Sequence, residues 1–132
     1  MIVFYVAGPF RGATAWHIRQ NVHAAEQLGF ALTTAAIKQG TPVAVIVPHS
    51  LGANFNGTHT DSYWLDATKA ILHRCDALLL TENWRTSAGA VAEFAAFRHK
   101  DRRFTSVDEA LRYVALTHLR EGAYRTGSGS DQ

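Results

Sequence analysis

The sequence has very little cysteine, little net charge and no long apolar run. Its single cysteine, Cys75, excludes a disulfide within the chain and a zinc site built from cysteines. The formal net charge is +2 and the basic residues form no stripe, which argues against duplex nucleic acid as a partner. No segment reaches the roughly 20 apolar residues that span a bilayer, and residues 1–6 lack the features of a secretory signal. We therefore expect a cytoplasmic protein with no membrane or nucleic-acid partner.

The composition predicts one domain with a real core. Of the 132 residues, 47% are apolar and 18% are charged, so the chain has enough apolar side chains for one core. A chain of this length is too short for two full domains. We expect residues 1–121 to form this domain. Residues 122–132 are rich in Gly and Ser, and we expect them to be a disordered tail.

Apolar patterning predicts alternating strands and helices. Three continuous apolar runs are typical of parallel strands buried on both faces, namely 2–6, 43–47 and 77–80. Apolar residues at three- and four-residue steps predict helices at 16–39, 61–74, 88–99 and 106–119. A short edge strand is expected at 103–105 and a polar loop at 49–60. This order predicts an α/β three-layer sandwich with four or five parallel strands.

Ligands in such folds bind at the carboxyl ends of the strands, so the loops there are the first candidates. The first of these loops reads Ala7-Gly8-Pro9-Phe10-Arg11-Gly12. It is neither a GxGxxG nor a Walker sequence, so neither a dinucleotide site nor a P-loop is supported. Gly8 would allow close approach of a ligand to the backbone. Arg11 either holds a phosphate or carboxylate or faces the solvent.

The segment around Glu93 is the most informative one. Ser87 is a natural N-cap, so Glu93 lies well inside the following apolar helix, where capping does not explain it. Helical side chains lean toward the N-terminus, so the Glu93 carboxylate should point at Gly89, one turn earlier. Gly89 leaves open space there, at the strand ends. Glu93 is therefore either a nucleophile or base, or an ordinary salt-bridged glutamate.

Other kinds of catalytic centre have no support in the sequence. The seven histidines show no metal-ligand spacing with a third ligand, and there is no Gly-x-Ser-x-Gly elbow. We therefore expect no metal and no cofactor.

Two motifs are fairly specific when they occur together: the Gly-Pro first loop and the segment Ser87-x-Gly89-Ala90-x-x-Glu93. Further matching residues are Tyr5, Asn21, Pro48-His49, Trp64-Leu65, Arg74-Cys75-Asp76-Ala77 and Trp84. With these residues, the chain resembles the nucleoside 2-deoxyribosyltransferase-like superfamily over about residues 2–115, and most closely a small bacterial and phage branch of it.

The resemblance implies a flavodoxin-like sheet and an N-glycosidic bond as the target. Members of that superfamily transfer deoxyribose between bases or hydrolyse a nucleotide to base and sugar phosphate. By this likeness Glu93 is the nucleophile that attacks the anomeric carbon and forms a covalent glycosyl-enzyme. The implied substrate-binding residues are Tyr5, Gly8, Pro9, Phe10, Arg11, Thr68, Trp84, Ser87 and Gly89. The resemblance also implies a homodimer or higher homo-oligomer, in which Thr105 or Ser106 would reach the neighbour's site.

One position departs from the superfamily. An aspartate that protonates the leaving base is usual eight residues before Asp76, where this chain has Thr68. A threonine cannot act as a general acid at neutral pH, and losing such a group reduces the rate by about 10²- to 10⁴-fold. Asp61 is the candidate replacement. Two hypotheses remain: an enzyme that cleaves or exchanges an N-glycosidic bond, and a non-catalytic nucleotide-binding or sensing module of the same fold.

Overall fold

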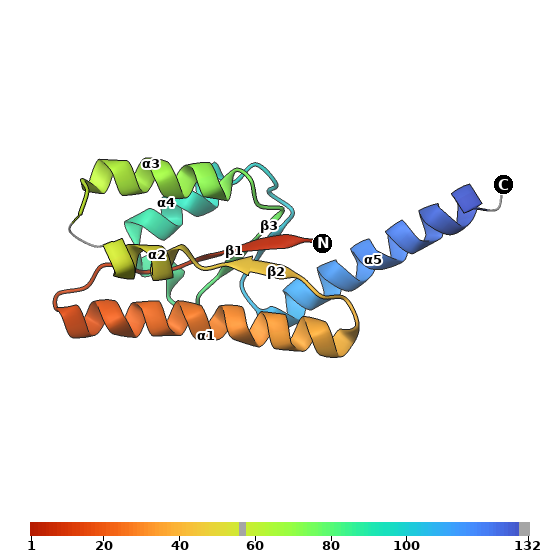
Figure 1. The fold of residues 1–132 in the computed structure, drawn as a ribbon, viewed down its shortest axis with the longest axis horizontal. Helices are drawn as coiled ribbons and strands as arrows, with labels where there is room; N and C mark the ends of the chain where they lie inside the picture. Colours follow the sequence, from red (N-terminus) through yellow and green to blue (C-terminus); the bar gives the residue numbers. More distant parts are fainter. Residues whose placement is uncertain (56–57, 130–132) are drawn as a thin grey trace.

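Four short strands form one parallel sheet at the centre of the molecule (Figure 1). The computed structural model describes the backbone of residues 1–55 and 58–129, and the side chains of 1–53 and 58–122. The strands are β1 (Val3–Ala7), β2 (Ala44–Ile46), β3 (Ala77–Leu80) and β4 (Arg103–Phe104), in the order β2-β1-β3-β4. Every neighbouring pair is parallel. The predicted α/β sandwich is thereby confirmed, with four strands.

Helices cover both faces of the sheet. Helices α1 (Ala15–Gln39) and α5 (Val107–Gly129) lie on one face, and α3 (Asp61–Leu72) and α4 (Ala88–Ala96) on the other (Figure 1). Alternate residues of β1 face opposite sides, so Phe4 packs with α1 and α5 while Tyr5 packs with α3 and α4. Side chains of β1 therefore reach the interior of both layers.

The ends of the long helix α1 follow from its sequence. Thr14 accepts a hydrogen bond from the backbone N–H of His17 and caps the N-terminus. Gly40 ends the helix at φ 83°, a left-handed conformation that favours glycine. The Ser106 hydroxyl accepts a hydrogen bond from the backbone N–H of Glu109 at 3.2 Å and caps the start of α5. No helix in the described part of the chain is both long and apolar enough to cross a membrane.

The structure corrects the predicted polar loop at 49–60. Residues 48–55 form helix α2 (Pro48–Phe55), and residues 56–57 lie outside the described residues. Pro48 is at the first helical position, where proline is favoured because its missing N–H needs no partner. Its Pro, Gly and Asn residues are typical of loops and concealed the helix, but Gly52 lies against the ring of Phe10. Helix α2 thus packs against the first loop through Phe10.

Helix α5 is longer than the predicted 106–119. It runs to Gly129 and includes residues 122–129, which the sequence predicted to be part of a disordered tail. Its last turns extend away from the sheet (Figure 1). Residues 130–132 lie outside the described residues. The hydrogen bonds within a helix need no tertiary contact, so apolar periodicity alone does not locate the end of such a helix.

Cys75 is a core residue. It is buried at the end of α3, and burial raises the pKa of its thiol to about 11. Because the thiolate is the reactive species, we expect Cys75 to react with a thiol reagent at pH 7.5 at least about 100-fold more slowly than free cysteine. Absorbance of a chromogenic disulfide reagent measures this rate. Full reactivity on adding urea is the control, and rapid labelling of the native protein would contradict the prediction.

Candidate active site

The strand order places the site at the carboxyl ends of β1 and β3. These two strands are neighbours in the sheet. The chain leaves β1 for α1 on one face and leaves β3 for α4 on the other face. In open parallel sheets, ligands bind where the connections reverse in this way, at the carboxyl ends of the strands. Gly8 and Thr81, the residues that follow the two strands, therefore border the candidate site.

Tyr5 and Glu93 meet in this region. The Tyr5 hydroxyl donates a hydrogen bond to Oε2 of Glu93. Tyr5 is buried and Glu93 is half-buried. Burial raises the pKa of Glu93 above its usual range, and the bond from Tyr5 opposes part of this rise. Burial and the neighbouring carboxyl raise the pKa of Tyr5, which keeps its phenol protonated as a donor.

Thr68 lies at the same place. Its side chain interacts with the Tyr5 hydroxyl, which slightly lowers the pKa of Tyr5. The Thr68 hydroxyl also donates to the carbonyl oxygen of Leu65 at 3.2 Å. Three elements, β1, α3 and α4, thus bring Tyr5, Thr68 and Glu93 together. We call these three residues the Tyr5–Thr68–Glu93 cluster.

Asp61 lies elsewhere. It precedes Thr68 by seven residues on the same face of α3, which corresponds to roughly 10 Å along the helix axis. Its carboxylate pairs with the guanidinium of Arg11, and both side chains are largely exposed. The structure therefore places Asp61 with the first loop and not with the cluster. An exposed pair of this kind contributes little to stability.

Helix α4 is fixed at both ends, which positions Glu93. The Ser87 hydroxyl accepts from the backbone N–H of Ala90 at 3.1 Å, as expected for the predicted N-cap. Trp84 is buried and stacks on Phe94, with ring centroids 4.7 Å apart. Arg103 donates to the carbonyl oxygen of Phe94 at 3.2 Å and lies over its ring. Trp84 was predicted to bind substrate, but it packs against Phe94 and helps to hold α4 in place.

The first loop has a glycine that the structure requires. A Cβ added to Gly8 would lie 2.3 Å from Oγ1 of Thr81, too close for any real contact. Pro9 is half-buried beside it, and Phe10 turns its ring toward α2, where it lies edge-on to His49. Of the predicted binding residues in this loop, only Arg11 is largely exposed.

Two glycine variants should have opposite effects on stability. We expect Gly8→Ala to lower the free energy of unfolding by about 1–3 kcal/mol, because the new methyl group overlaps Thr81. Gly89→Ala should raise it by up to about 1 kcal/mol, because its Cβ would lie 3.8 Å from Oγ of Ser87, in open space on a helix. Urea unfolding followed by circular dichroism measures both. Equal stabilities of the two variants would contradict this geometry.

Sequence reasoning gave no role to Asn21, His49, Thr81 or Arg103. Asn21 and His49 contact backbone carbonyls of the first loop, Thr81 contacts Gly8, and Arg103 caps α4. Each contact joins residues at least nine positions apart, so no local pattern reveals it. The only available signal was the match of Asn21 and Pro48-His49 to the superfamily pattern.

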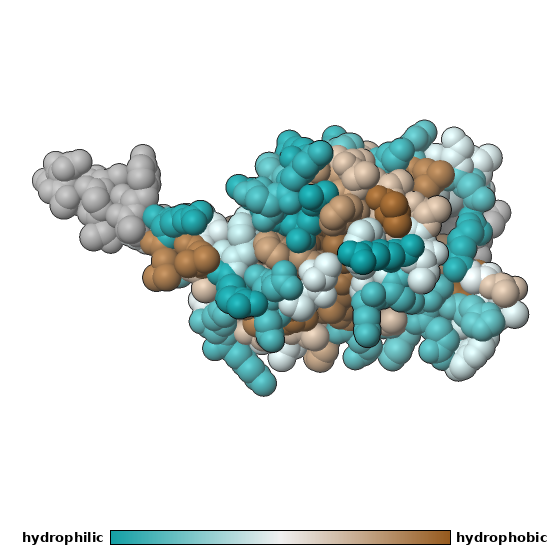
Figure 2. Space-filling view, turned by 180° about the vertical axis from the view of Figure 1, so that it is seen from behind, coloured by the Kyte–Doolittle hydropathy of each residue, from teal (hydrophilic) through white to brown (hydrophobic). Residues whose placement is uncertain are grey.

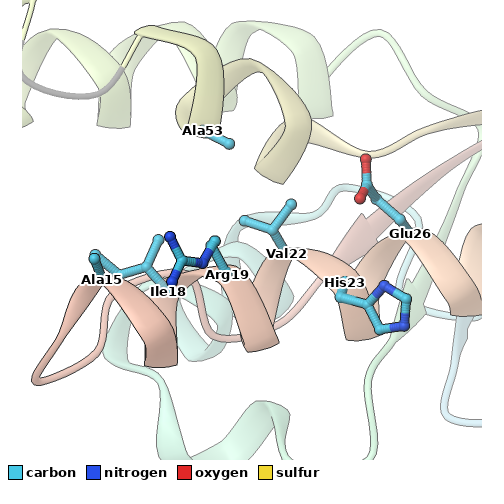
Figure 3. Close-up of a pocket in the computed structure, with 7 residues that line it drawn as sticks. All are labelled: Ala15, Ile18, Arg19, Val22, His23, Glu26 and Ala53. Atoms are coloured by element: carbon cyan, nitrogen blue, oxygen red, sulfur yellow. The ribbon is translucent and has the colours of Figure 1, made fainter.

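A separate hollow of about 480 Å³ lies between α1 and α2 (Figure 3). Its lining residues are Ala15, Ile18, Arg19, Val22, His23, Glu26 and Ala53. Glu26 points toward α2, where it accepts a hydrogen bond from Ser50 at 2.7 Å (Figure 3). No residue of the Tyr5–Thr68–Glu93 cluster lines this hollow, so it is distinct from the candidate site. Among the residues the structure describes, no three His, Cys, Asp or Glu side chains are grouped to hold a metal ion.

Comparison with known proteins identifies a family. Neither the curated proteins nor the solved structures contain a match to this chain. A family model matches residues 2–105, a span that includes all four strands and the whole Tyr5–Thr68–Glu93 cluster. Its description is a domain of unknown function, DUF4406. Because the match covers most of the chain, this protein belongs to the DUF4406 family.

Proposed function

We propose that this protein cleaves or exchanges the N-glycosidic bond of a nucleoside or deoxynucleoside, or of its 5′-monophosphate. The observation that carries the proposal is the Glu93 carboxylate, held by the Tyr5 hydroxyl at the carboxyl ends of β1 and β3. Open space lies beside Gly89, one turn before Glu93. The resemblance to the nucleoside 2-deoxyribosyltransferase-like superfamily supports the same conclusion.

The proposed reaction has two steps. One carboxylate oxygen of Glu93 attacks the anomeric carbon, and the C–N bond breaks with its electron pair leaving on the base, which takes a proton from water. The sugar is then an ester of Glu93, and water or a second base attacks the same carbon and releases the carboxylate. Since Tyr5 donates to Oε2, Oε1 is the oxygen that attacks. Tyr5 thus orients the nucleophile and leaves Oε1 free to attack.

Arg11 favours a substrate with an anionic group. Its guanidinium already pairs with a carboxylate, that of Asp61, at the end of α3 nearest the first loop. A 5′-phosphate would replace Asp61 as its partner and would offer two oxygens to the planar guanidinium. This supports a nucleoside monophosphate over the free nucleoside.

A second copy of the chain is the proposed protein partner. The outer face of α4 is apolar and exposed: Val91 is 41% exposed, and Ala88, Ala92, Ala95 and Ala96 are exposed as well. Seen from behind, brown and pale-brown residues gather over α4 (Figure 2). A homodimer that covers α4 would bury this face beside Glu93. Sedimentation velocity tests the oligomeric state.

One observation favours a second candidate function, a nucleotide-binding or sensing module without catalysis. The cluster has Thr68 where a group able to protonate the leaving base is expected. Such a module would bind a nucleotide and be stabilised by it, by about 2.7 kcal/mol at 100-fold excess over Kd. It would release no base.

The deciding experiment is an incubation with ribo- and deoxyribonucleosides and their 5′-monophosphates, followed by chromatography for free base. A second base is added in parallel as an acceptor. Release or exchange of base by the wild-type protein would establish the reaction, and the best substrate would identify the class. Thermal stabilisation by a nucleotide without any product would instead favour the binding module.

A further inference from the structure

The backbone of the first loop is held by two side chains. Nε2 of His49 lies 3.0 Å from the carbonyl oxygen of Gly8 and 3.1 Å from that of Pro9. Nδ2 of Asn21 donates to the carbonyl oxygens of Phe10 at 3.2 Å and Arg11 at 3.1 Å. Four successive carbonyls of the loop thus accept hydrogen bonds from α2 and α1.

The chemistry of His49 fixes how it acts. Both partners of Nε2 are carbonyl oxygens, which only accept, so Nε2 carries the hydrogen. Burial lowers the pKa of His49 below its usual value, which keeps the ring neutral. Its Nδ1 is buried without a hydrogen-bond partner among the residues that the structure describes. A buried acceptor without a partner is unfavourable, so an apolar side chain would fill this space better if packing were its only role.

We infer that His49 and Asn21 are positioning residues for the proposed glycosidic reaction: they set the backbone of the first loop and thereby place Arg11. The inference rests on the proposed function for its effect on catalysis. In a trans peptide the N–H points opposite to the carbonyl. Fixing the four carbonyls therefore turns the N–H groups of Phe10, Arg11 and Gly12 away from His49 and Asn21. The same constraint fixes the backbone from which Arg11 reaches Asp61.

The test compares variants that remove the donor with variants that keep it. His49→Leu removes the N–H, and Asn21→Asp replaces a donor with an acceptor that repels the two carbonyls. His49→Gln retains an N–H group at a similar reach. His23→Gln is the matched control, since His23 is an exposed histidine on α1 outside the candidate site. Two quantities are measured: the rate at which trypsin cleaves the native protein after Arg11, followed by mass spectrometry of the fragments, and kcat and KM for base release from the best substrate.

We expect His49→Leu and Asn21→Asp to speed cleavage after Arg11 by about tenfold, the equivalent of losing one or two of the hydrogen bonds that hold the loop. Hydrogen exchange in β3 is the control for folding and should stay unchanged, which shows that the fold is intact. In the same variants kcat/KM should fall by about tenfold, mainly through KM for a phosphorylated substrate. His49→Gln should restore most of both properties, and His23→Gln should match the wild type.

Each other result has a defined meaning. Unchanged cleavage after Arg11 in His49→Leu and Asn21→Asp would overturn the inference, whatever the activity. Faster cleavage with unchanged kcat/KM would overturn the role in the reaction. If the wild type releases no base, the proposed function fails, and the cleavage measurement still decides whether the two side chains hold the loop.

Discussion

Replacing Glu93 with glutamine is expected to abolish base release, with a loss in kcat of about 10³-fold or more, while the protein stays folded. Glutamine has the same shape and can still accept the hydrogen bond from Tyr5, but its amide cannot form the glycosyl ester. Base release by chromatography measures the loss. Glu121→Gln is the matched control because Glu121 is exposed on α5, away from the cluster. Activity retained in Glu93→Gln would remove Glu93 from the mechanism.

The same substitution makes a prediction about pH and stability. Burial raises the pKa of Glu93 in the folded state, so the folded protein binds this proton more tightly than the unfolded chain. This contribution to stability is fully present below the unfolded pKa and is lost as the pH rises through the folded one. Glu93→Gln should therefore be more stable than the wild type at pH 8, and the difference should shrink toward pH 4. Urea unfolding at both values measures it, and a difference independent of pH would contradict the assignment.

Activity should follow the ionised form of the same carboxyl. The nucleophile must be charged, so kcat/KM should fall as the pH drops below the raised pKa of Glu93. In Tyr5→Phe the hydrogen bond that favours the carboxylate is gone, and this acidic limb should move to higher pH. A profile in Tyr5→Phe identical to that of the wild type would show that Tyr5 does not tune the nucleophile.

Much of the fold and part of the site could be predicted from local patterns. The continuous apolar runs predicted three strands, of which β1 and β3 are buried as expected, whereas β2 lies at the edge of the sheet and is only half-buried. The position of Glu93 six residues after Ser87 predicted a carboxylate inside α4. Helix α2 was missed because its Pro, Gly and Asn residues are typical of loops, and its packing against Phe10 depends on tertiary structure. The pairing of Tyr5 with Glu93 depends on how β1 and α4 are placed against each other across 88 positions in sequence, and only tertiary structure sets that. The pairing of Arg11 with Asp61 is likewise set only by tertiary structure. It places Asp61 beside the first loop and away from Glu93.

Thr68→Asp is expected to have the opposite effect to Glu93→Gln: a gain in kcat/KM of base release of about 10²-fold, and up to 10⁴-fold. Thr68 interacts with the Tyr5 hydroxyl, and that hydroxyl holds Glu93, so a carboxyl at position 68 would stand beside the nucleophile. Two carboxyls so close cannot both ionise easily, and the pKa of one is raised. At neutral pH the pair would then hold one proton, which is available to the leaving base. General acids of this kind contribute about 10²- to 10⁴-fold.

Thr68→Asn separates this effect from changes of shape, because asparagine has nearly the same size as aspartate and no acidic proton. A gain in Thr68→Asp but not in Thr68→Asn would show that the wild-type site lacks only the acid, and that the enzyme acts on a base that leaves easily. Thr68→Asp should also unfold at lower urea than the wild type at pH 8 and less so at pH 5, because the shared proton relieves the repulsion between two half-buried carboxyls. If Thr68→Asp still binds a nucleotide, as thermal shift reports, and gains no activity, then the missing acid does not limit the reaction. The site would in that case be explained better by binding than by catalysis, since the nucleophile, its donor and an acid would all be present without turnover.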